Sequence, residues 1–293
     1  MAERIQKVLA RCGLGSRREV ERWITEGRLT VNKKPAQLGQ SLKGGERLAL
    51  DGKPVNWTPE QPVPRVLAYH KPEGEVVSQF DPESRPTVFE SLPPLQTGRW
   101  VAIGRLDINT SGLLLLTNNG ELAQRLMHPS GEFERVYAAR VFGDFEEKEA
   151  IEALTKGVQL EDGPAKFDKV SLKGGDGANR WFECTLKEGR FREVRRLWQA
   201  VGGEVSRLTR VRYAGIGLPR NLSRGMFVDL TPNQLNQLMR ACDLPEVDRD
   251  ESMRVAADRF KKPQRLKDLK VGKKALGNPK YGQRTPNRNK PRR

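Results

Sequence analysis

The sequence predicts an α+β protein whose mixed sheet is mostly antiparallel. Segments typical of strands and of helices follow one another without the strict alternation of a parallel α/β fold. Hydrophobic residues make up 36% of the 293 residues and charged residues 31%, so a sizeable core lies under a strongly charged surface. No apolar run approaches the roughly 18 residues that span a membrane, and the first residues do not resemble a secretory signal. We therefore expect a cytoplasmic protein of about two domains with no membrane partner.

The positive charge is concentrated at the two ends of the chain. The formal net charge is +16, of which residues 1–60 carry +5 and residues 261–293 carry +12. We predict a basic, disordered tail over 246–293, because its last part is rich in Lys, Arg, Pro, Asn and Gly and cannot bury enough apolar surface to order itself. Such a tail contacts polyanions or only keeps a chain soluble; the basic N-terminal end favours contact with nucleic acid.

Cysteine and histidine are too sparse to support a metal site or a disulfide framework. Cys12, Cys184 and Cys242 lie far apart and form no CxxC pair, which is typical of a reducing compartment. There are only two histidines, His70 and His128. The chain also lacks the glycine-rich loop and lysine of a phosphate-binding loop. We expect no metal and no cofactor, so any chemistry must come from carboxylate, Tyr, Lys or Arg side chains.

Residues 1–60 predict a small domain of two helices and a hairpin-bearing sheet. Ser16 and Glu19 form a capping box that starts the second helix, and Gly27 ends it. Strand-like segments follow, with an Asp51-Gly52 turn. The capped helix start and its arginines form a candidate anion site for RNA phosphates, although a solvated basic helix face would have the same pattern. The candidate RNA-binding residues are Ser16, Arg17, Arg18 and Arg22.

A proline-rich linker at 61–64 precedes a second predicted domain over 65–245. In this domain 65–78 is expected to form two strands joined by a Lys-Pro-Glu-Gly turn. Further strands are expected in 100–103, 112–117, 134–143, 166–173, 180–187 and 204–215, and helices in 121–127, 146–157, 191–202 and 231–241. The run 112–116 is continuously apolar, which indicates a strand buried on both faces.

Asp107 lies in a polar loop between two of these apolar strands. Loops held between buried strands often carry catalytic groups. An aspartate in such a loop can equally be a turn former that caps its own backbone, and spacing alone does not decide between these interpretations.

Three segments carry a resemblance that does decide. GRLDINTSGLLLLTNNG (104–120) fills every fixed position of the signature G-R-L-D-x-x-T-x-G-L-L-L-x-T-x-x-G of the small-ribosomal-subunit (RsuA-type) family of pseudouridine synthases. ERVYAARV (134–141) and EGRFREVRRLW (188–198) resemble the second and third motifs of that family. GLGSRR and the Gly27, Leu29, Val31, Asn32 series resemble the S4 RNA-binding domain. Several further stretches most resemble the members that modify large-subunit ribosomal RNA.

The resemblance implies a cofactor-free isomerisation of uridine to pseudouridine with base flipping, and it assigns roles to particular residues. Asp107 would be the essential carboxylate, which attacks the ribose or takes its 2′ proton. Arg195 would pair with Asp107, Tyr137 would stack on the uracil, and Arg105 would fill the space that the flipped base leaves. Leu197 would pack under the uracil, although a plain core leucine is an equally good description; Tyr137 alone would likewise be interpreted as a core tyrosine of the sheet.

The target that the resemblance implies is a uridine in 23S ribosomal RNA. Small-subunit RNA and transfer RNA remain open, because related enzymes share the catalytic loop. A different class of function, a non-catalytic ribosomal RNA-binding or assembly factor, would also explain the two basic ends. A monomer is the default expectation for the oligomeric state.

Overall fold

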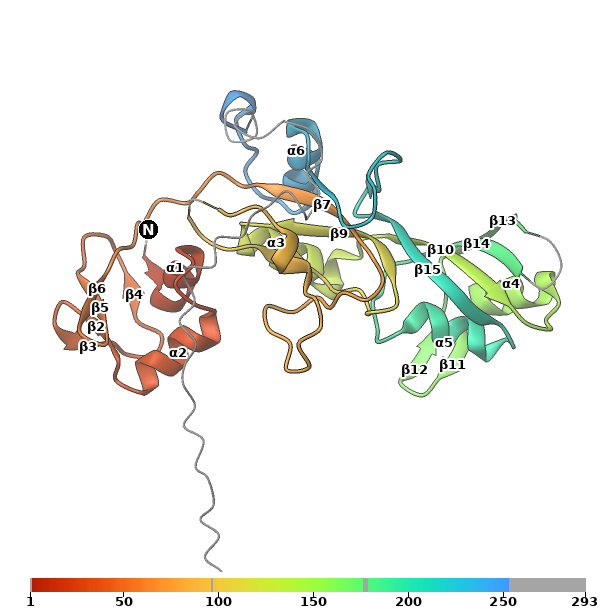
Figure 1. Ribbon diagram of the computed structural model, residues 1–293, viewed down its shortest axis with the longest axis horizontal. Coiled ribbons are helices and arrows are strands. Elements are labelled where there is room, and N and C mark those ends of the chain that lie inside the picture. Colours follow the sequence, from red (N-terminus) through yellow and green to blue (C-terminus); the bar gives the residue numbers. More distant parts are fainter. Residues whose placement is uncertain (1, 96, 176–178, 253–293) are drawn as a thin grey trace, which may run out of the picture.

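The structure is a computed structural model in which residues 2–95, 97–175 and 179–252 are described. A small N-terminal domain lies at one end of an elongated molecule, and one long twisted sheet runs through the rest (Figure 1). Most of the predicted tail, residues 253–293, lies outside the described residues. Within the described part, no helix is both long enough and apolar enough to cross a bilayer.

The N-terminal domain follows the predicted order of elements. Helices α1 (Ile5–Arg11) and α2 (Arg17–Thr25) pack on a four-stranded sheet in the order β3-β2-β5-β6. The capping box is present: Glu19 N–H donates to Ser16 Oγ (3.1 Å) and Ser16 N–H donates to the Glu19 carboxylate (2.6 Å). The strands are β2 (Leu29–Val31), β3 (Lys34–Pro35), β5 (Leu48–Leu50) and β6 (Lys53–Val55), with a separate pair of β1 (Glu3–Arg4) and β4 (Ser41–Leu42).

The second domain is built on a nine-stranded sheet in the order β13-β14-β10-β15-β9-β7-β17, with β16 paired to β15 and β8 paired to β9 off this path. Among the named strands of the described residues, only β9 and β15 pair in parallel, so the prediction of a mostly antiparallel mixed sheet is confirmed. The strands are β7 (Val66–Lys71), β8 (Val101–Ile103), β9 (Ser111–Thr117), β10 (Arg135–Phe142), β13 (Lys169–Gly174), β14 (Asn179–Leu186), β15 (Glu204–Tyr213), β16 (Ile216–Gly217) and β17 (Phe227–Asp229).

The sheet separates two hydrophobic cores. Residues of β9 alternate between them, Leu114 and Leu116 on one face and Leu113 and Leu115 on the other, as expected for a strand buried on both faces. Helices α4 (Glu147–Lys156) and α5 (Glu193–Ala200) contribute to the first core, together with the hairpin β11 (Val158–Leu160) and β12 (Gly163–Ala165). Helices α3 (Gly120–Met127) and α6 (Pro232–Ala241) contribute to the second. Short 3-10 turns occupy Val88–Ser91 and Pro129–Gly131.

Two boundaries differ from the sequence prediction. The second strand expected within 65–78 is absent, and only an isolated bridge joins Val76 to Thr87. Pro86, which has no N–H, lies beside this bridge and prevents a continued ladder. The start of the predicted tail is also folded: Val247 is buried against the second core, and its backbone N–H and carbonyl both pair with the Asn236 amide. The folded part of the chain therefore extends beyond position 246, where the predicted tail begins.

Gly112 allows β9 and β15 to approach each other. It faces Arg210 across the parallel pair and has a positive φ of 109°. A Cβ at this position would lie 2.6 Å from the Arg210 backbone nitrogen, closer than a real side chain tolerates. Gly112 therefore fixes the position at which the Asp107 loop joins the sheet.

We predict that Gly112→Ala destabilises the protein by at least about 1–3 kcal/mol, the range for a non-glycine residue held in such a backbone conformation, with the steric clash in addition. Chemical denaturation monitored by circular dichroism measures this change. The matched control is Gly217→Ala, because nothing lies within 4 Å of a Cβ at that position. Equal stability of the two variants would contradict the close approach of β9 and β15.

Candidate active site

A cavity of about 890 Å³ opens where the Asp107 loop, strands β10 and β15, and two further loops meet. One of these loops, residues 76–89, lies between β7 and β8; the other, residues 188–193, precedes and begins α5. The arginine side chains that line the cavity give it a strongly positive wall. They are Arg85, Arg99, Arg105, Arg135, Arg190, Arg192 and Arg210.

Asp107 lines this cavity and is partly exposed. Its backbone carbonyl accepts from Thr110 N–H (3.0 Å), which closes a tight turn after the β8 strand. Within the described residues its carboxylate takes part in no hydrogen bond or ion pair, so the group is available to a substrate. The turn at Asp107 is therefore closed by its backbone carbonyl, and the side chain does not act as the turn former that the sequence left open.

Lys71 is a fully buried lysine under the Asp107 loop. Its Nζ donates to the carbonyl oxygens of Pro72 (2.9 Å) and Thr110 (3.0 Å), with a longer contact to that of Ile108 (3.4 Å). Burial lowers the pKa of Lys71 to about 8, and the neighbouring carboxylates of Glu75 and Asp107 oppose this shift. The lysine therefore holds the backbone that directly follows Asp107 and places a positive group near the carboxylate.

Arg195 lies near Asp107 but does not form the predicted ion pair in this structure. Its guanidinium donates to the carbonyl oxygens of Asn109 (2.9 Å) and Val205 (2.6 Å), and in the described part of the chain no salt bridge joins it to Asp107. Burial and the nearby Arg192 lower the pKa of Arg195, while the negative charge of Asp107 raises it. Because the Arg195 guanidinium donates to the Asn109 carbonyl, Arg195 holds the backbone of the Asp107 loop and not the Asp107 carboxylate.

The remaining predicted residues fall into two groups. Tyr137 on β10 is 9% exposed and lines the cavity, and the exposed Arg105 lines it as well. Leu197 is fully buried in the first core and is not part of the cavity wall, so the core description is the one that the structure supports. The cavity thus brings together Asp107, Arg105 and Tyr137, with Arg195 behind the loop.

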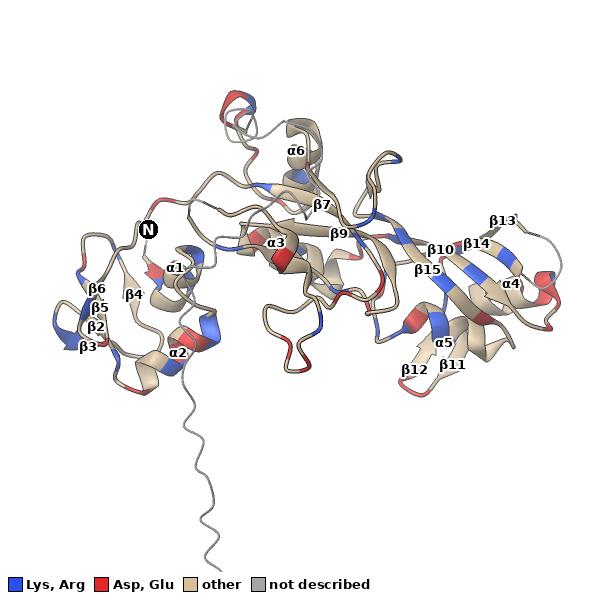
Figure 2. Cartoon of the chain, in the orientation of Figure 1, with Lys and Arg blue, Asp and Glu red and all other residues tan. Residues whose placement is uncertain are grey.

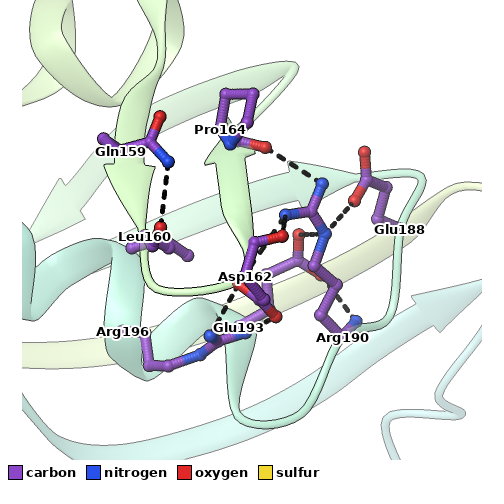
Figure 3. A network of polar contacts seen from close by, with 8 residues as sticks. All are labelled: Gln159, Leu160, Asp162, Pro164, Glu188, Arg190, Glu193 and Arg196. Atoms are coloured by element: carbon purple, nitrogen blue, oxygen red, sulfur yellow. Dashed lines mark hydrogen bonds and ion pairs between the residues drawn. The ribbon is translucent and has the colours of Figure 1, made fainter.

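A polar network holds the 188–193 loop in place (Figure 3). Arg190 donates from its side chain to Glu188 (2.6 Å) and to the Pro164 carbonyl (3.0 Å), and from its backbone to the buried Glu193 (2.9 Å). Arg196 forms a two-pronged pair with Asp162 in the turn of the β11–β12 hairpin (both 2.8 Å). The hairpin, which the sequence did not reveal, therefore stabilises one wall of the cavity.

The three predicted RNA-binding arginines lie on α2 and are exposed, whereas Ser16 is partly buried at its start; Figure 2 shows the charged residues of this domain. Ser16 caps the helix through its hydroxyl, so that oxygen is already engaged. Arg17 and Arg18 stand at the start of α2, and Arg22 lies 3.9 Å from Glu26. Burial lowers the pKa of Arg99, the nearby Glu19 raises it, and the nearby Arg17 lowers it. The first turn of α2 therefore lies near Arg99, which lines the Asp107 cavity.

Sequence reasoning missed several residues of this site. Lys71 was assigned only to a turn, although a lysine directly after a buried strand is an unusual position that could have drawn notice. Arg210 is 2% exposed and lies two positions after the inward-facing Leu208, so alternation along β15 was a usable signal. No group of His, Cys, Asp or Glu side chains in the described ranges is arranged to hold a metal ion.

A small basic domain joined to a domain whose cavity gathers arginines, an aspartate and a tyrosine defines an enzyme that acts on RNA. Comparison with known families gives the class of reaction. Residues 3–48 match the S4 domain, and residues 65–200 match the RNA pseudouridylate synthase family. The chain belongs to this pseudouridine synthase family.

Individual relatives agree with this assignment. The chain is 48% identical, over 99% of both chains, to the ribosomal large subunit pseudouridine synthase B of Escherichia coli K12. It is 52% identical to the protein of the same name from Yersinia pestis, over 88% of this chain and 82% of that one. A solved structure described as a pseudouridylate synthase superposes with a TM-score of 0.55 at 26% identity, and the match covers 80% of this chain and 99% of that chain.

We predict that Lys71→Met, which keeps an unbranched aliphatic stem but removes the N–H donors, lowers turnover about ten-fold or more because the Thr110 and Ile108 carbonyls lose their partner. Steady-state kinetics measure this effect. The control is Lys156→Met, whose side chain is 74% exposed on α4. Unchanged turnover in Lys71→Met would contradict a role in holding the loop.

Lys71 also gives the stability of the wild-type protein a pH dependence that Lys71→Met lacks. Between about 8, the folded pKa, and 10.5, the ordinary value, the unfolded chain binds more protons than the folded one. The contribution of Lys71 to the free energy of unfolding therefore rises with pH across this window. It is complete above the upper value and absent below the lower one. Denaturation of wild type and Lys71→Met across the window should give a difference that grows with pH, whereas a constant difference would contradict the burial of a charged lysine.

Proposed function

We propose that this protein converts a uridine of large-subunit ribosomal RNA to pseudouridine, with Asp107 as the catalytic carboxylate. The observation that carries the proposal is the Asp107 carboxylate, which has no partner among the described residues and lies in an arginine-lined cavity together with Tyr137. The names of the relatives support the large subunit as the source of the RNA. We further propose that the protein acts in the cytoplasm as a monomer and requires no metal or cofactor.

The reaction exchanges one bond for another within a single nucleotide. The N1–C1′ bond breaks, the uracil turns, C5 bonds to C1′, the C5 proton leaves and N1 gains a proton. In this proposal the Asp107 carboxylate acts on the ribose, either by attack at C1′ or by removal of the 2′ proton. Lys71 and Arg195 hold the carbonyls of residues 108–110, directly after Asp107, so the carboxylate needs little rearrangement when the nucleotide arrives.

The uridine must leave its helix to reach this carboxylate. Eversion costs a few kcal/mol, which contacts with the flipped base and with the vacated stack must offset. Tyr137, largely buried in the cavity wall, is placed to stack on the uracil, and the exposed Arg105 is placed to enter the RNA stack. The exposed Arg17 and Arg18 of the S4 domain supply phosphate contacts away from the target base.

Asp107→Asn should reduce release of tritium from C5-labelled uridine in ribosomal RNA by at least about 10³-fold, while RNA affinity stays within a few-fold of wild type. The amide keeps the size of the side chain but cannot act as a carboxylate. The control is Asp144→Asn, because Asp144 is exposed in the loop before α4, away from the cavity. Undiminished turnover by Asp107→Asn would end the assignment of this residue.

The choice of RNA is tested by mapping pseudouridine in ribosomal RNA from cells that lack this protein. We expect at least one modified position to disappear from large-subunit RNA and to return when wild type is supplied, but not when Asp107→Asn is supplied. A site lost instead from small-subunit or transfer RNA would reassign the substrate. Recovery of the modification with Asp107→Asn would favour a non-catalytic assembly role.

A further inference from the structure

Arg210 is a buried arginine in the wall of the Asp107 cavity with one nitrogen that has no partner. The residue is 2% exposed and lines the cavity. Its Nε donates to the Leu113 carbonyl (2.8 Å), whereas Nη2 is buried and has no hydrogen-bond partner among the described residues. A buried N–H without a partner is costly, and among the described arginines with such a nitrogen only Arg210 lines this cavity, so a ligand bound there is placed to supply the missing acceptor.

The fold holds this guanidinium firmly. Arg210 faces Tyr137 across the β10–β15 pair, next to a register shift between Val136 and Tyr137. The guanidinium also lies 4.8 Å from the centre of the Tyr213 ring, whose hydroxyl is fixed to the Leu126 carbonyl (2.7 Å). Arg210 therefore reaches the cavity in one orientation, on the strand adjacent to the tyrosine that is placed to stack on the base.

We propose that Arg210 binds a ring carbonyl of the everted uracil through Nη2. A phosphate is a poorer fit, because a guanidinium only 2% exposed and backed by Tyr213 offers no open surface to a hydrated backbone group. The flat, less hydrated edge of a base placed against Tyr137, the cross-strand partner of Arg210, fits this position better. The proposal rests on the function above, because it requires the uridine to enter this cavity.

The geometry of the reaction gives this contact a particular use. When uracil turns about the line through N3 and C6, C5 takes the place of N1, and the two carbonyls O4 and O2 exchange places. A donor fixed at one carbonyl position therefore meets an equivalent oxygen before and after the turn. Arg210 keeps the detached ring in register during the rotation, which makes it a positioning and binding residue for the base.

The test combines Arg210→Met with substrates that carry uridine, 2-thiouridine or 4-thiouridine at the target position of the RNA. Sulfur is a weaker hydrogen-bond acceptor than oxygen. For wild type we expect at least one of the two thio substitutions to lower kcat/KM about ten-fold or more, as for a lost hydrogen bond to a charged donor. In Arg210→Met the same substitution should change kcat/KM less than about three-fold. The control is Arg212→Met on the exposed side of β15, which should retain the wild-type sensitivity to sulfur.

The outcomes separate this inference from the proposed function. Turnover of unmodified uridine by wild type tests the function alone. If wild type turns over uridine but is insensitive to both thio substitutions, or if their effects simply add to that of Arg210→Met, the proposed contact is absent. If Arg210→Met fails to fold, the three substrates are compared with the wild-type enzyme alone, and insensitivity to both thio substitutions still refutes the inference.

Discussion

The parallel contact between β9 and β15 is the constraint on which the active site depends. At this contact Gly112 lies against the Arg210 backbone, and the Arg210 side chain returns to the Leu113 carbonyl. The loop that carries Asp107 enters β9 immediately before this point, and Tyr137 lies across from Arg210 on the neighbouring strand. One close approach of two backbones therefore sets the carboxylate, the ring and the buried guanidinium relative to one another.

Polar contacts within the protein hold the backbone around the site. Lys71 and Arg195 each donate to backbone carbonyls of the Asp107 loop, and the Arg190 network fixes the opposite wall. These donors have their partners inside the protein, so they hold geometry without competing for RNA. In the proposed function the exposed arginines of α2 have the complementary role, because charge in water steers and holds a polyanion with little demand on precise placement.

Much of this architecture could be predicted from the sequence because its causes are local. The Ser16–Glu19 capping box and the apolar alternation of β9 each specify a structure over a few residues. The Arg195 contact could not be predicted in the same way, since a motif names the residue but not which oxygen it meets. The β11–β12 hairpin is short and gains its role from Arg190 and Arg196, and the loss of the strand at 75–78 depends on Pro86. Such features arise from tertiary contacts that no local pattern encodes.

The most direct test of this account is a crystal structure of Asp107→Asn bound to a stem-loop RNA that contains the target uridine. The account predicts an everted uridine with its C1′ facing residue 107, its ring against Tyr137 and one ring carbonyl within hydrogen-bonding distance of Arg210. A uridine that remains stacked in the RNA, or one that lies outside the Asp107 cavity, would contradict it.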